Sequence, residues 1–511
     1  MMNDQLKYRI VSSLEMKKME SETINGYGIP SLSLMERAAY QSYEKIKEIS
    51  GDIKNAVIFC GSGNNGGDGF SIGRIMNDRN IRVKIIFVGN PDKMTSEAGL
   101  NKAICEKRGI EITDIDYIKA CTDITENADV IVDAMLGIGI TGEVRPRIKS
   151  AANLIKHIRD NNRGNKKVFA IDIPSGLNSD TGMVMGSCVP ADHTITMQWI
   201  KRGLILNKGP EYTGEIIPID VNIYDDGSDI NTFTCSLDLY DYMPKKSITG
   251  NKGTSGKILF ITGSAGMPGA MILSAKAALL SGGGMVKVIS DSVNRDLLVH
   301  ELPEAMFQDI NDDKENILKS FEWCTSLVIG CGLGDSPAVK NMVLYALKNC
   351  SKPVVVDADG LNILSGYERY KIKEIFNKRY IDGAPTIITP HPGEFARLFK
   401  TDLKDKNNQD PDFVRELAEE FKIIIIAKDA RTIVSDGKTV YINTVTSKYL
   451  GTAGSGDVLA GMTGYFAGIE KDMFDAAVYS VFLHGYMGEK AGERRLFEGI
   501  RAGDITDALK D

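Results

Sequence analysis

Two amides and a carboxylate lie close together in a glycine-rich stretch near the N-terminus, GSGNNGGDG, residues 61–69. The side chains of Asn64, Asn65 and Asp68 offer oxygen atoms suited to hydrogen bonding with a ligand, to cation coordination and to proton transfer. A tight turn before the helical stretch FSIGRIMNDR needs only the glycines, so the turn alone is the simpler alternative. The added polar side chains favour a ligand site.

The same stretch matches the spacing G-x-G-x-x-G, which is typical of dinucleotide-binding loops but is a weak signal alone. In such loops an acidic residue at the end of the second strand contacts a ribose hydroxyl. Here that strand, VKIIFVGN, ends in Gly89 and Asn90. A dehydrogenase-type cofactor site is therefore disfavoured.

Polar residues also end two further apolar runs of the first half. Asp133 precedes a second glycine loop at 137–142, and Asp172 and Ser175 follow the run KVFAI. Carboxyl ends of neighbouring parallel strands meet at one edge of a sheet, so we expect Asp68, Asp133 and Asp172 to converge. Taken singly, each aspartate has the alternative of capping a turn.

Two lysines in the segment KRGLILNKGP are candidates for contact with ligand phosphates. These are Lys201 and Lys208. Lysine is mostly exposed in proteins, and we expect both to be solvated surface residues.

A second candidate site lies near the C-terminus, in TSKYLGTAGSGDVLAGMTGYFAG, residues 446–468. Asp457 falls in the first turn of a helix of small residues, where a carboxylate also has a purely structural role. Capping does not require the sequence G-x-G-D after Thr452 and Ala453. The arrangement favours an anion hole for a transferring phosphoryl group, with the carboxylate activating a hydroxyl nucleophile.

Short β-branched runs that alternate with longer helical stretches position these residues. The runs at 55–60, 83–88, 129–136 and 167–173 predict a Rossmann-like, doubly wound parallel sheet. The alternation stops over the polar, turn-rich segment 224–256 and then restarts as an α/β sandwich. We expect two α/β domains, residues 1–238 and 239–511, with strands in the second that begin at KILFI, MVKVIS, TSLVIG, KPVVV, APTII and FKIIIIA.

Composition narrows the class of function. The chain has 511 residues, 43% hydrophobic and 25% charged, with a net charge of −7 and a pI near 5.5. These values argue against a nucleic-acid or anionic-membrane partner and favour small-molecule chemistry. The polar start and short apolar runs predict a cytoplasmic protein, which we expect to be homo-oligomeric. Eight scattered cysteines and five histidines predict reduced thiols and no zinc site of that type.

Three motifs of the first half carry a family resemblance. GNNGGDGF, DAMLGIGITGE and DIPSGLNSDTG resemble the signature segments of the NAD(P)H-hydrate epimerases, over roughly residues 1–220. That family interconverts the R and S forms of hydrated NADH or NADPH. The resemblance implies that Asp68 and Asp172 transfer protons at the hydrated ring carbon. It implies a potassium site at Asn65, Asp133 and Ser175, and a hydrate site at Asn64, Asn65, Gly66, Gly67, Asp68, Gly137, Ile138, Gly139, Ile140, Thr141, Gly142, Glu143 and Asp172.

The second half resembles the ribokinase-like superfamily through the turn at Asp457. GSAGMPGAMILSAKAALLSGGG, VIGCGLG and TPHPGEFARL narrow the resemblance to the ADP-dependent NAD(P)H-hydrate dehydratases, over about residues 240–511. That family phosphorylates the S hydrate with ADP and Mg²⁺ and expels phosphate, which leaves AMP and restored NAD(P)H. The resemblance implies Asp457 as base. It implies hydrate contacts from Ala270, Gly332, Gly334, His391 and Asp457, and nucleotide contacts from Lys428, Asp429, Ala430, Arg431, Thr432, Gly454, Ser455 and Gly456.

Two features depart from the dehydratase pattern. Asp429 stands where glycine is expected after Lys428, and the proline-rich run that usually precedes the catalytic turn is absent. The nucleotide preference is therefore less secure than the fold. Asp357 and Asp359 are expected to shape the pocket rather than to react.

Together the two resemblances name consecutive steps of one repair reaction, with NADH or NADPH hydrate and ADP as substrates. The alternative within enzymes is a ribokinase-like vitamin or sugar kinase fused to a non-catalytic nucleotide-binding domain. A non-catalytic scaffold is the alternative from another class, and the presence of Asp68 and Asp172 argues against it.

Overall fold

The computed structural model describes residues 6–161, 166–224, 231–245, 252–402, 407–445, 448–495 and 499–510. The chain forms two compact units, which we call the N-terminal unit (Tyr8–Ile230) and the C-terminal unit (Met1–Lys7 with Asn231–Asp511). A functional boundary at residues 238 and 239 stays a prediction, as do the cytoplasmic location and the oligomeric state. Among the described residues, no helix combines the length and apolar character needed to cross a membrane.

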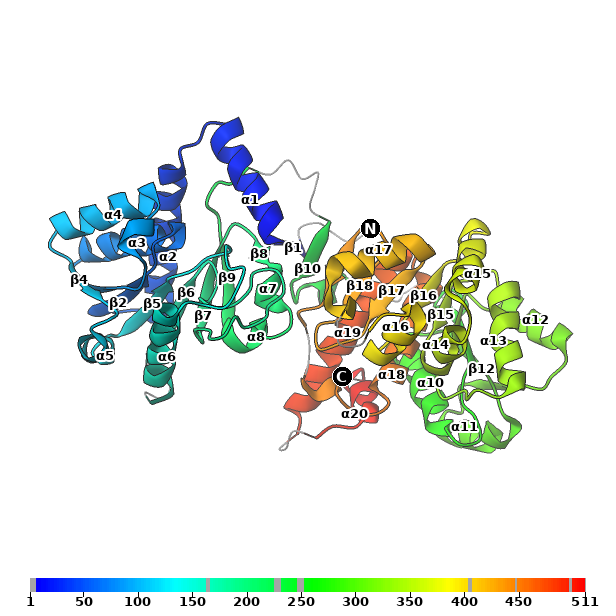
Figure 1. Ribbon diagram of the computed structural model, residues 1–511. Coiled ribbons are helices and arrows are strands. Elements are labelled where there is room, and N and C mark those ends of the chain that lie inside the picture. The colour runs from blue at the N-terminus through cyan, green and yellow to red at the C-terminus, as the bar shows by residue number, and fades with distance from the viewer. Residues whose placement is uncertain are drawn as a thin grey trace. The chain divides into compact units, whose positions relative to one another are not determined.

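The N-terminal unit is built on one parallel sheet (Figure 1). Its strand order reverses direction along the chain between β2 and β5, which is the switch point of a doubly wound sheet. In spatial order the strands are β4 (Glu111–Asp114), β3 (Arg82–Phe87), β2 (Asn55–Cys60), β5 (Val130–Ala134), β6 (Lys167–Ile171), β7 (His193–Met197) and β9 (Glu215–Ile219).

Helices cover both faces of this sheet (Figure 1). One buried core contains Tyr43 and Phe70, and the core on the opposite face contains Cys121 and Ile155. Because both faces are buried, the strands are almost continuously apolar. The helices of the first layer are α2 (Ser31–Ser50), α3 (Asn64–Asn77) and α4 (Ser96–Lys107), and those of the second are α5 (Ile118–Glu126) and α6 (Pro146–Asn161).

A smaller group of elements completes the N-terminal unit. Strand β1 (Lys7–Val11) pairs in parallel with β8 (Ile200–Lys201), and helix α1 (Ser13–Ser21) follows β1. Ser12 and Glu15 form a capping box that fixes where α1 begins. The short helices are α7 (Arg202–Ile205) and α8 (Gly209–Tyr212).

The C-terminal unit contains a longer mixed sheet. Its strands run parallel from β13 to β17, then antiparallel through β18 and β19, with β10 parallel to β19. In spatial order they are β13 (Met306–Asp309), β12 (Met285–Ser290), β11 (Lys257–Ile261), β14 (Ser326–Ile329), β15 (Val354–Val356), β16 (Thr386–Ile388), β17 (Ile424–Ala427), β18 (Ile433–Ser435), β19 (Val440–Ile442) and β10 (Thr232–Cys235).

Helices rich in small residues pack against this sheet. Gly461 of α18 approaches α10 so closely that a Cβ would lie 2.1 Å from the Ser274 carbonyl oxygen, which explains the glycine. One buried core includes α10 (Pro268–Ser281), α18 (Ser455–Ile469), α19 (Met473–Glu493) and α20 (Ala502–Ala508). The other helices are α9 (Leu239–Tyr242), α11 (Arg295–Glu301), α12 (Lys314–Trp323), α13 (Pro337–Asn349), α14 (Ala358–Ser365), α15 (Arg369–Ile381), α16 (Pro392–Phe399) and α17 (Pro411–Phe421).

The predicted α/β class and the predicted strands are confirmed, with two local differences. Helix α3 begins at Asn64, so Gly66, Gly67 and Gly69 lie inside its first turns, whereas Gly61 and Gly63 precede the helix. There Gly69 packs against Cys60 and Ala134, a close approach that outweighs the poor helix propensity of glycine. The polar, turn-rich segment 224–256 interrupts the alternation, and its described part adds two short elements that were not predicted, β10 and α9.

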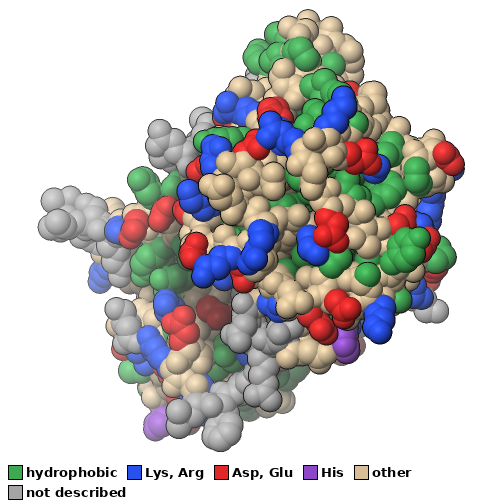
Figure 2. Space-filling view, turned by 90° about the vertical axis from the view of Figure 1, so that its left-hand side faces the viewer, with side chains coloured by type: hydrophobic (Ala, Val, Ile, Leu, Met, Phe, Trp, Pro, Cys, Tyr) green, Lys and Arg blue, Asp and Glu red, His purple; other side chains and the backbone are tan. Residues whose placement is uncertain are grey.

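The distribution of charge on the surface agrees with the mixed charge of the sequence. Figure 2 shows charged side chains of both signs interspersed over the visible face. All eight cysteines are buried free thiols, as the sequence predicted.

Candidate active sites

A cavity of about 1210 Å³ opens in the N-terminal unit at the carboxyl ends of its strands. Most of the predicted hydrate site lines it: Asn64, Asn65, Asp68, Gly137, Ile138, Gly139, Ile140, Thr141, Gly142, Glu143 and Asp172. Gly66 and Gly67 serve packing instead, since a Cβ would lie 2.1 Å from the Gly61 oxygen at the first and 2.7 Å from Met35 at the second. The sequence therefore located the cavity and much of its wall.

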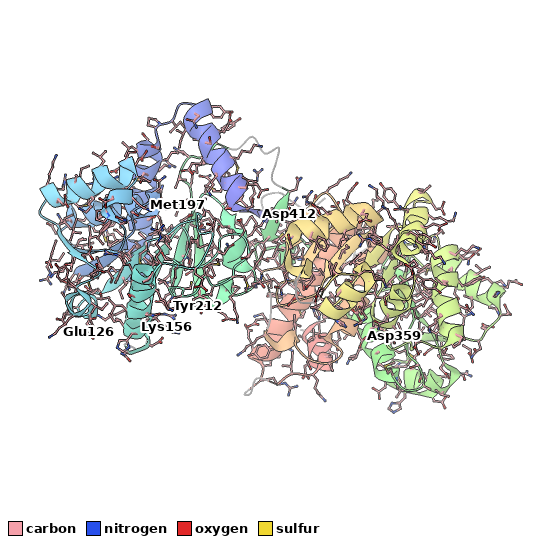
Figure 3. All side chains as sticks on the ribbon, viewed as in Figure 1. Glu126, Lys156, Met197, Tyr212, Asp359 and Asp412 are labelled. Atoms are coloured by element: carbon pink, nitrogen blue, oxygen red, sulfur yellow. The ribbon has the colours of Figure 1, made fainter. Side chains whose placement is uncertain are left out.

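Two of the cavity carboxyls sit in different surroundings. The pKa of Asp68 lies well above its usual range, because the group is buried and because Asp172 and Glu20 add negative charge nearby. Asp172 instead accepts a hydrogen bond of 2.5 Å from the Lys201 ammonium and one of 3.3 Å from the Met197 amide, labelled in Figure 3. Asp68 is thus suited to donate a proton and Asp172 to accept one.

The expectation for Lys201 was wrong, because its side chain is fully buried. Besides Asp172, its ammonium donates to the Thr196 hydroxyl at 3.0 Å and to the Met197 carbonyl at 2.7 Å. All three N–H groups are therefore used, which makes burial of the charge tolerable. Lys208 does lie at the surface, where it pairs with Glu211 at 2.6 Å.

Asp172 itself has an unusual backbone. Its φ of +66° is in the left-handed region that non-glycine residues seldom adopt. Its amide donates to the Ile195 carbonyl at 2.7 Å, and its Oδ2 lies near the position that a Gly137 Cβ would take, 3.6 Å away. Such strain is typical of residues that the fold holds in place for function.

Of the predicted potassium ligands, Asn65 lines the cavity, whereas Asp133 and Ser175 are not among its lining residues. Asp133 is fully buried and accepts from the Ser175 hydroxyl at 2.6 Å and the Ser175 amide at 2.8 Å. Asn65 donates to the carbonyls of Leu136 and Ile171, and its buried Oδ1 has no hydrogen-bond partner among the residues that the structure describes. Burial raises the pKa of Asp133 to about 6, although the Ser175 hydrogen bonds oppose this. Oxygen donors and a buried carboxylate suit a cation.

Sequence reasoning missed Glu20 and placed Lys201 at the surface. Glu20 lies in EMKKMESE, which resembles any solvated helix surface, and only its i, i+4 spacing from Met16 places both on the cavity side of α1. Nothing in the sequence around Lys201 marks it as buried.

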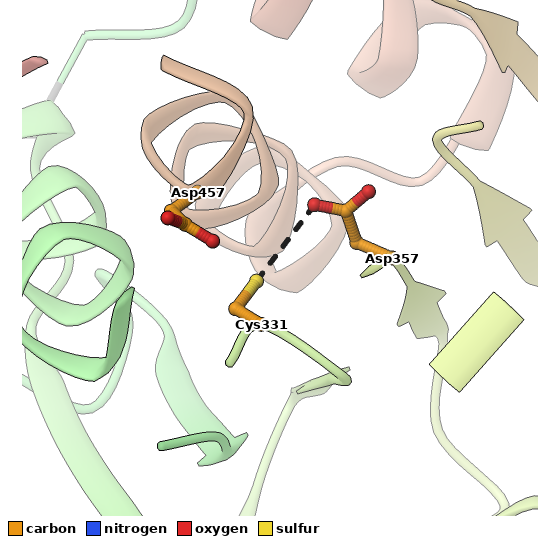
Figure 4. A group of neighbouring side chains, drawn as sticks. All are labelled: Cys331, Asp357 and Asp457. Atoms are coloured by element: carbon orange, nitrogen blue, oxygen red, sulfur yellow. Dashed lines mark hydrogen bonds between the residues drawn. The ribbon is translucent and has the colours of Figure 1, made fainter. Parts of the chain in front are cut away.

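The second site lies at the carboxyl ends of β14 to β17, beside the start of α18. Asp457 is in the first turn of α18, as predicted, and Gly454 caps that helix with a φ of +87°. The side chains of Cys331, Asp357 and Asp457 face one another, with possible ligand atoms within 4.8 Å (Figure 4). Burial and the charge of Asp357 raise the pKa of Asp457 to about 6, so it is a carboxylate base at neutral pH.

Lys428 brings a positive charge to this acidic group. It lies directly after β17 and pairs with Asp357 at 2.8 Å. A Cβ on Gly456 would lie 3.2 Å from its ammonium, so the charge sits beside the N-terminus of α18. Burial alone would lower the pKa of Lys428, but the carboxylates of Asp357 and Glu394 outweigh burial and raise it. The ammonium and the helix N-terminus together suit a phosphate.

Three of the predicted hydrate contacts are Ala270, Gly332 and Gly334. A Cβ on Gly332 would lie 2.7 Å from the Ala270 Cβ, so the glycine allows its loop and the start of α10 to lie close together. The Gly334 amide donates to Asp359 at 2.7 Å, and Figure 3 labels this aspartate. Asp359 therefore shapes the glycine loop.

His391 caps α16 and accepts from the Gly393 amide at 3.0 Å. Burial and the nearby Lys428 lower the pKa of His391. Its neighbour Glu394 accepts from the His391 amide at 2.8 Å, and burial raises the pKa of Glu394 to about 7. His391 is half exposed, so a ligand can reach it.

The predicted nucleotide stretch 428–432 forms a turn between β17 and β18. Asp429, which replaces the expected glycine, accepts from Asn408 at 2.9 Å and from the Ala430 amide at 2.7 Å. Thr432 donates to the Asp429 carbonyl at 3.3 Å, and Arg431 donates to the Thr444 carbonyl at 2.8 Å. These contacts hold the turn in place.

Comparison with known proteins gives two family matches, one in each half of the chain. Residues 31–203 match the family described as YjeF-related protein N-terminus, and residues 258–511 match that of NAD(P)H-hydrate dehydratase. The bifunctional NAD(P)H-hydrate repair enzyme Nnr of Moorella thermoacetica is 31% identical, over 98% of this chain and 96% of that protein. Its counterpart from Dictyoglomus turgidum is 33% identical, over 98% and 97%.

Solved structures resemble the chain over about half its length. The ADP/ATP-dependent NAD(P)H-hydrate dehydratase of Bacillus subtilis, co-crystallised with ATP and Mg²⁺, is 25% identical over 52% of this chain and 92% of that one, with a TM-score of 0.45. A ribokinase-like superfamily protein of Enterococcus faecalis is 21% identical over 56% and 96%, with a TM-score of 0.49. From its nearly full-length relatives, the chain belongs to the family of bifunctional NAD(P)H-hydrate repair enzymes.

Proposed function

We propose that the N-terminal unit interconverts the R and S hydrates of NADH or NADPH, and that the C-terminal unit dehydrates the S hydrate at the cost of a nucleotide. The observation that carries this assignment is the presence, in one chain of this family, of two separate acid–base sites. One is the Asp68 and Asp172 cavity, and the other is Asp457 beside Lys428.

Epimerisation needs a proton donor and a proton acceptor. The hydroxyl must leave one face of the ring carbon and water must add to the other face. The protonated Asp68 donates to the departing hydroxyl, which leaves as water while the ring nitrogen's electron pair forms a C=N bond. Asp172, held by Lys201, accepts the proton of the water that adds. General acid and base groups of this kind contribute typically about 10²–10⁴-fold.

The residues present are compatible with the predicted potassium ion. The orphaned Asn65 Oδ1, the Ser175 hydroxyl and the buried Asp133 carboxylate are the oxygen donors that would hold it. When bound, such a cation supplies positive charge that stabilises the buried carboxylate and nearby negative groups of a ligand.

In the C-terminal unit, Asp457 removes the proton of the hydrate's hydroxyl so that its oxygen can attack the terminal phosphorus of the nucleotide. The backbone of residues 454–456 and the Lys428 ammonium stabilise the transferring phosphoryl group. Loss of phosphate from the phosphorylated carbon, followed by loss of a proton from the adjacent ring carbon, then forms the ring C=C bond and restores the dihydronicotinamide ring. We infer ADP with Mg²⁺ as donor, which leaves AMP. The Bacillus subtilis dehydratase with ATP and Mg²⁺ supports a nucleotide and Mg²⁺ but leaves the choice between ADP and ATP to experiment.

The test follows each epimer separately. Purified R and S hydrates are incubated with the full-length protein and Mg²⁺, with ADP, with ATP or with neither, and NADH absorbance, free phosphate and epimer ratio are measured. We expect epimer exchange without nucleotide, and NADH with equal phosphate when ADP is present. A stable phosphorylated product without NADH would support the kinase alternative, and persistence of both epimers would refute the proposal.

A further inference from the structure

The epimerase cavity contains a third carboxyl, Glu20, that the two-residue scheme does not use. Glu20 lines the cavity with Asp68 and Asp172, although it comes from α1, far away in sequence. Helix α1 is fixed at its start, where Ser13 donates to Asp180 through its amide at 2.6 Å and its hydroxyl at 2.5 Å. Glu20 therefore has a defined place in the wall.

The free oxygen atoms of the three carboxyls set what they can do. Asp172 Oδ1 is occupied by Lys201 and Met197, which leaves Oδ2 free. Within the described chain, neither Asp68 nor Glu20 makes a side-chain hydrogen bond. The Lys201 ammonium thus bonds only one of the three carboxyls, and free carboxyl oxygens remain in the cavity for proton exchange.

Electrostatics tie Glu20 to both partners. The pKa of Glu20 is raised by burial and then by the charge of Asp172, while Lys201 and Lys17 oppose the rise. Glu20 in turn helps to raise the pKa of Asp68. The charged groups that act on Glu20 therefore come from α1 and from the ends of β6 and β8.

The scheme above leaves the enzyme in the wrong protonation state after one turnover. Asp68 has lost its proton to the departing water, and Asp172 has gained one from the water that adds. Another turnover in the same direction requires that proton to return to Asp68. We propose that Glu20, which lines the same cavity as these two groups and interacts electrostatically with both, is the relay residue that carries it. The proposal rests on the proposed epimerase function.

Each step of the relay is balanced. Asp172 gives its proton to the Glu20 carboxylate, and Glu20 then gives a proton to the Asp68 carboxylate. One O–H bond breaks and one forms in each step, with no redox change. The cavity returns to a protonated Asp68 and an ionised Asp172 without any co-reactant.

A relay has a kinetic signature that a structural role lacks. The return of the proton follows product release, so it limits kcat at saturating hydrate but does not enter kcat/KM. For Glu20→Gln, which keeps the size but not the proton exchange, we expect kcat and KM of epimerisation to fall together by about tenfold or more. High concentrations of acetate or formate should restore kcat by carrying the proton.

The experiment uses the full-length protein and one purified epimer without nucleotide, with epimers separated by chromatography. Glu22→Gln is the matched control, because Glu22 is exposed just beyond α1. Glu20→Ala, which leaves room for formate, is the second variant, and thermal unfolding is recorded for each. Loss of kcat/KM in Glu20→Gln, unchanged kcat, or absence of rescue in both variants would overturn the relay. Failure of the wild type to exchange epimers would instead refute the proposed function.

Discussion

Replacing Asp457 by Asn should stabilise the C-terminal unit while it abolishes dehydration. The pKa of Asp457 is raised from 3.8 to about 6, chiefly by burial. Each pKa unit corresponds to about 1.4 kcal/mol, so the ionised carboxylate costs the folded state roughly 3 kcal/mol. Its place at a helix N-terminus offsets about 0.3–1 kcal/mol. A net gain of roughly 2 kcal/mol remains for the amide, which carries no charge.

The gain depends on pH with a definite sign. Because the folded pKa lies above the unfolded value, this group's contribution to wild-type stability is fully present below about pH 4 and is lost as the pH rises to about 6. Asp457→Asn does not lose stability in this way, because its amide does not ionise. The difference in unfolding free energy should therefore be near zero below about pH 4 and reach its full size above about pH 6.

The assay takes advantage of the two tryptophans, Trp199 in the N-terminal unit and Trp323 in the C-terminal unit. In a Trp199→Phe background, urea unfolding followed by fluorescence reports on the C-terminal unit. We expect dehydration to fall by about 10²–10⁴-fold and epimerisation to persist. An Asp457→Asn variant that is less stable than its parent at about pH 8, or that still dehydrates the S hydrate, would refute the reasoning.

Three further substitutions test the separate devices of the two sites. Lys201→Met should abolish epimerisation and destabilise the N-terminal unit by about 3–5 kcal/mol, measured by unfolding, because the buried Asp172 carboxylate loses its partner. Asn65→Leu should remove the activation of epimerisation by K⁺, measured against choline at constant ionic strength, because its free Oδ1 is lost. Gly456→Ala should raise the KM for nucleotide by up to about tenfold, measured by NADH formation, because its methyl group would lie 3.2 Å from the Lys428 ammonium, which must shift by a few tenths of an ångström.

Matched variants control for general damage. Lys208→Met removes an exposed lysine and should leave epimerisation unchanged. Gly503→Ala adds a methyl group in open space and should leave the nucleotide KM unchanged. Equal effects in a variant and its control, or K⁺ activation that survives in Asn65→Leu, would contradict the corresponding prediction.

The sequence by itself determined the α/β class, the apolar strands and the polar residues that end them. This works because chain direction, strand period and the shared edge of a parallel sheet are local or topological properties. Strand ends and glycine spacing alone predicted that Asp68 and Asp172 lie close together and that Asp457 lies in the first turn of its helix.

Only the tertiary structure decided how deeply those residues are buried and which charges surround them. The pKa values of Asp68 and Asp457 depend on burial and on charges from remote segments, and Lys201 is buried only because β8 lies beside Asp172. Gly66, Gly67 and Gly69 of the first motif proved to be helical, and at Gly69 close packing against β2 and β5 outweighs the poor helix propensity of glycine. Glu20 reaches the cavity from α1, a placement that no pattern in its own segment contains.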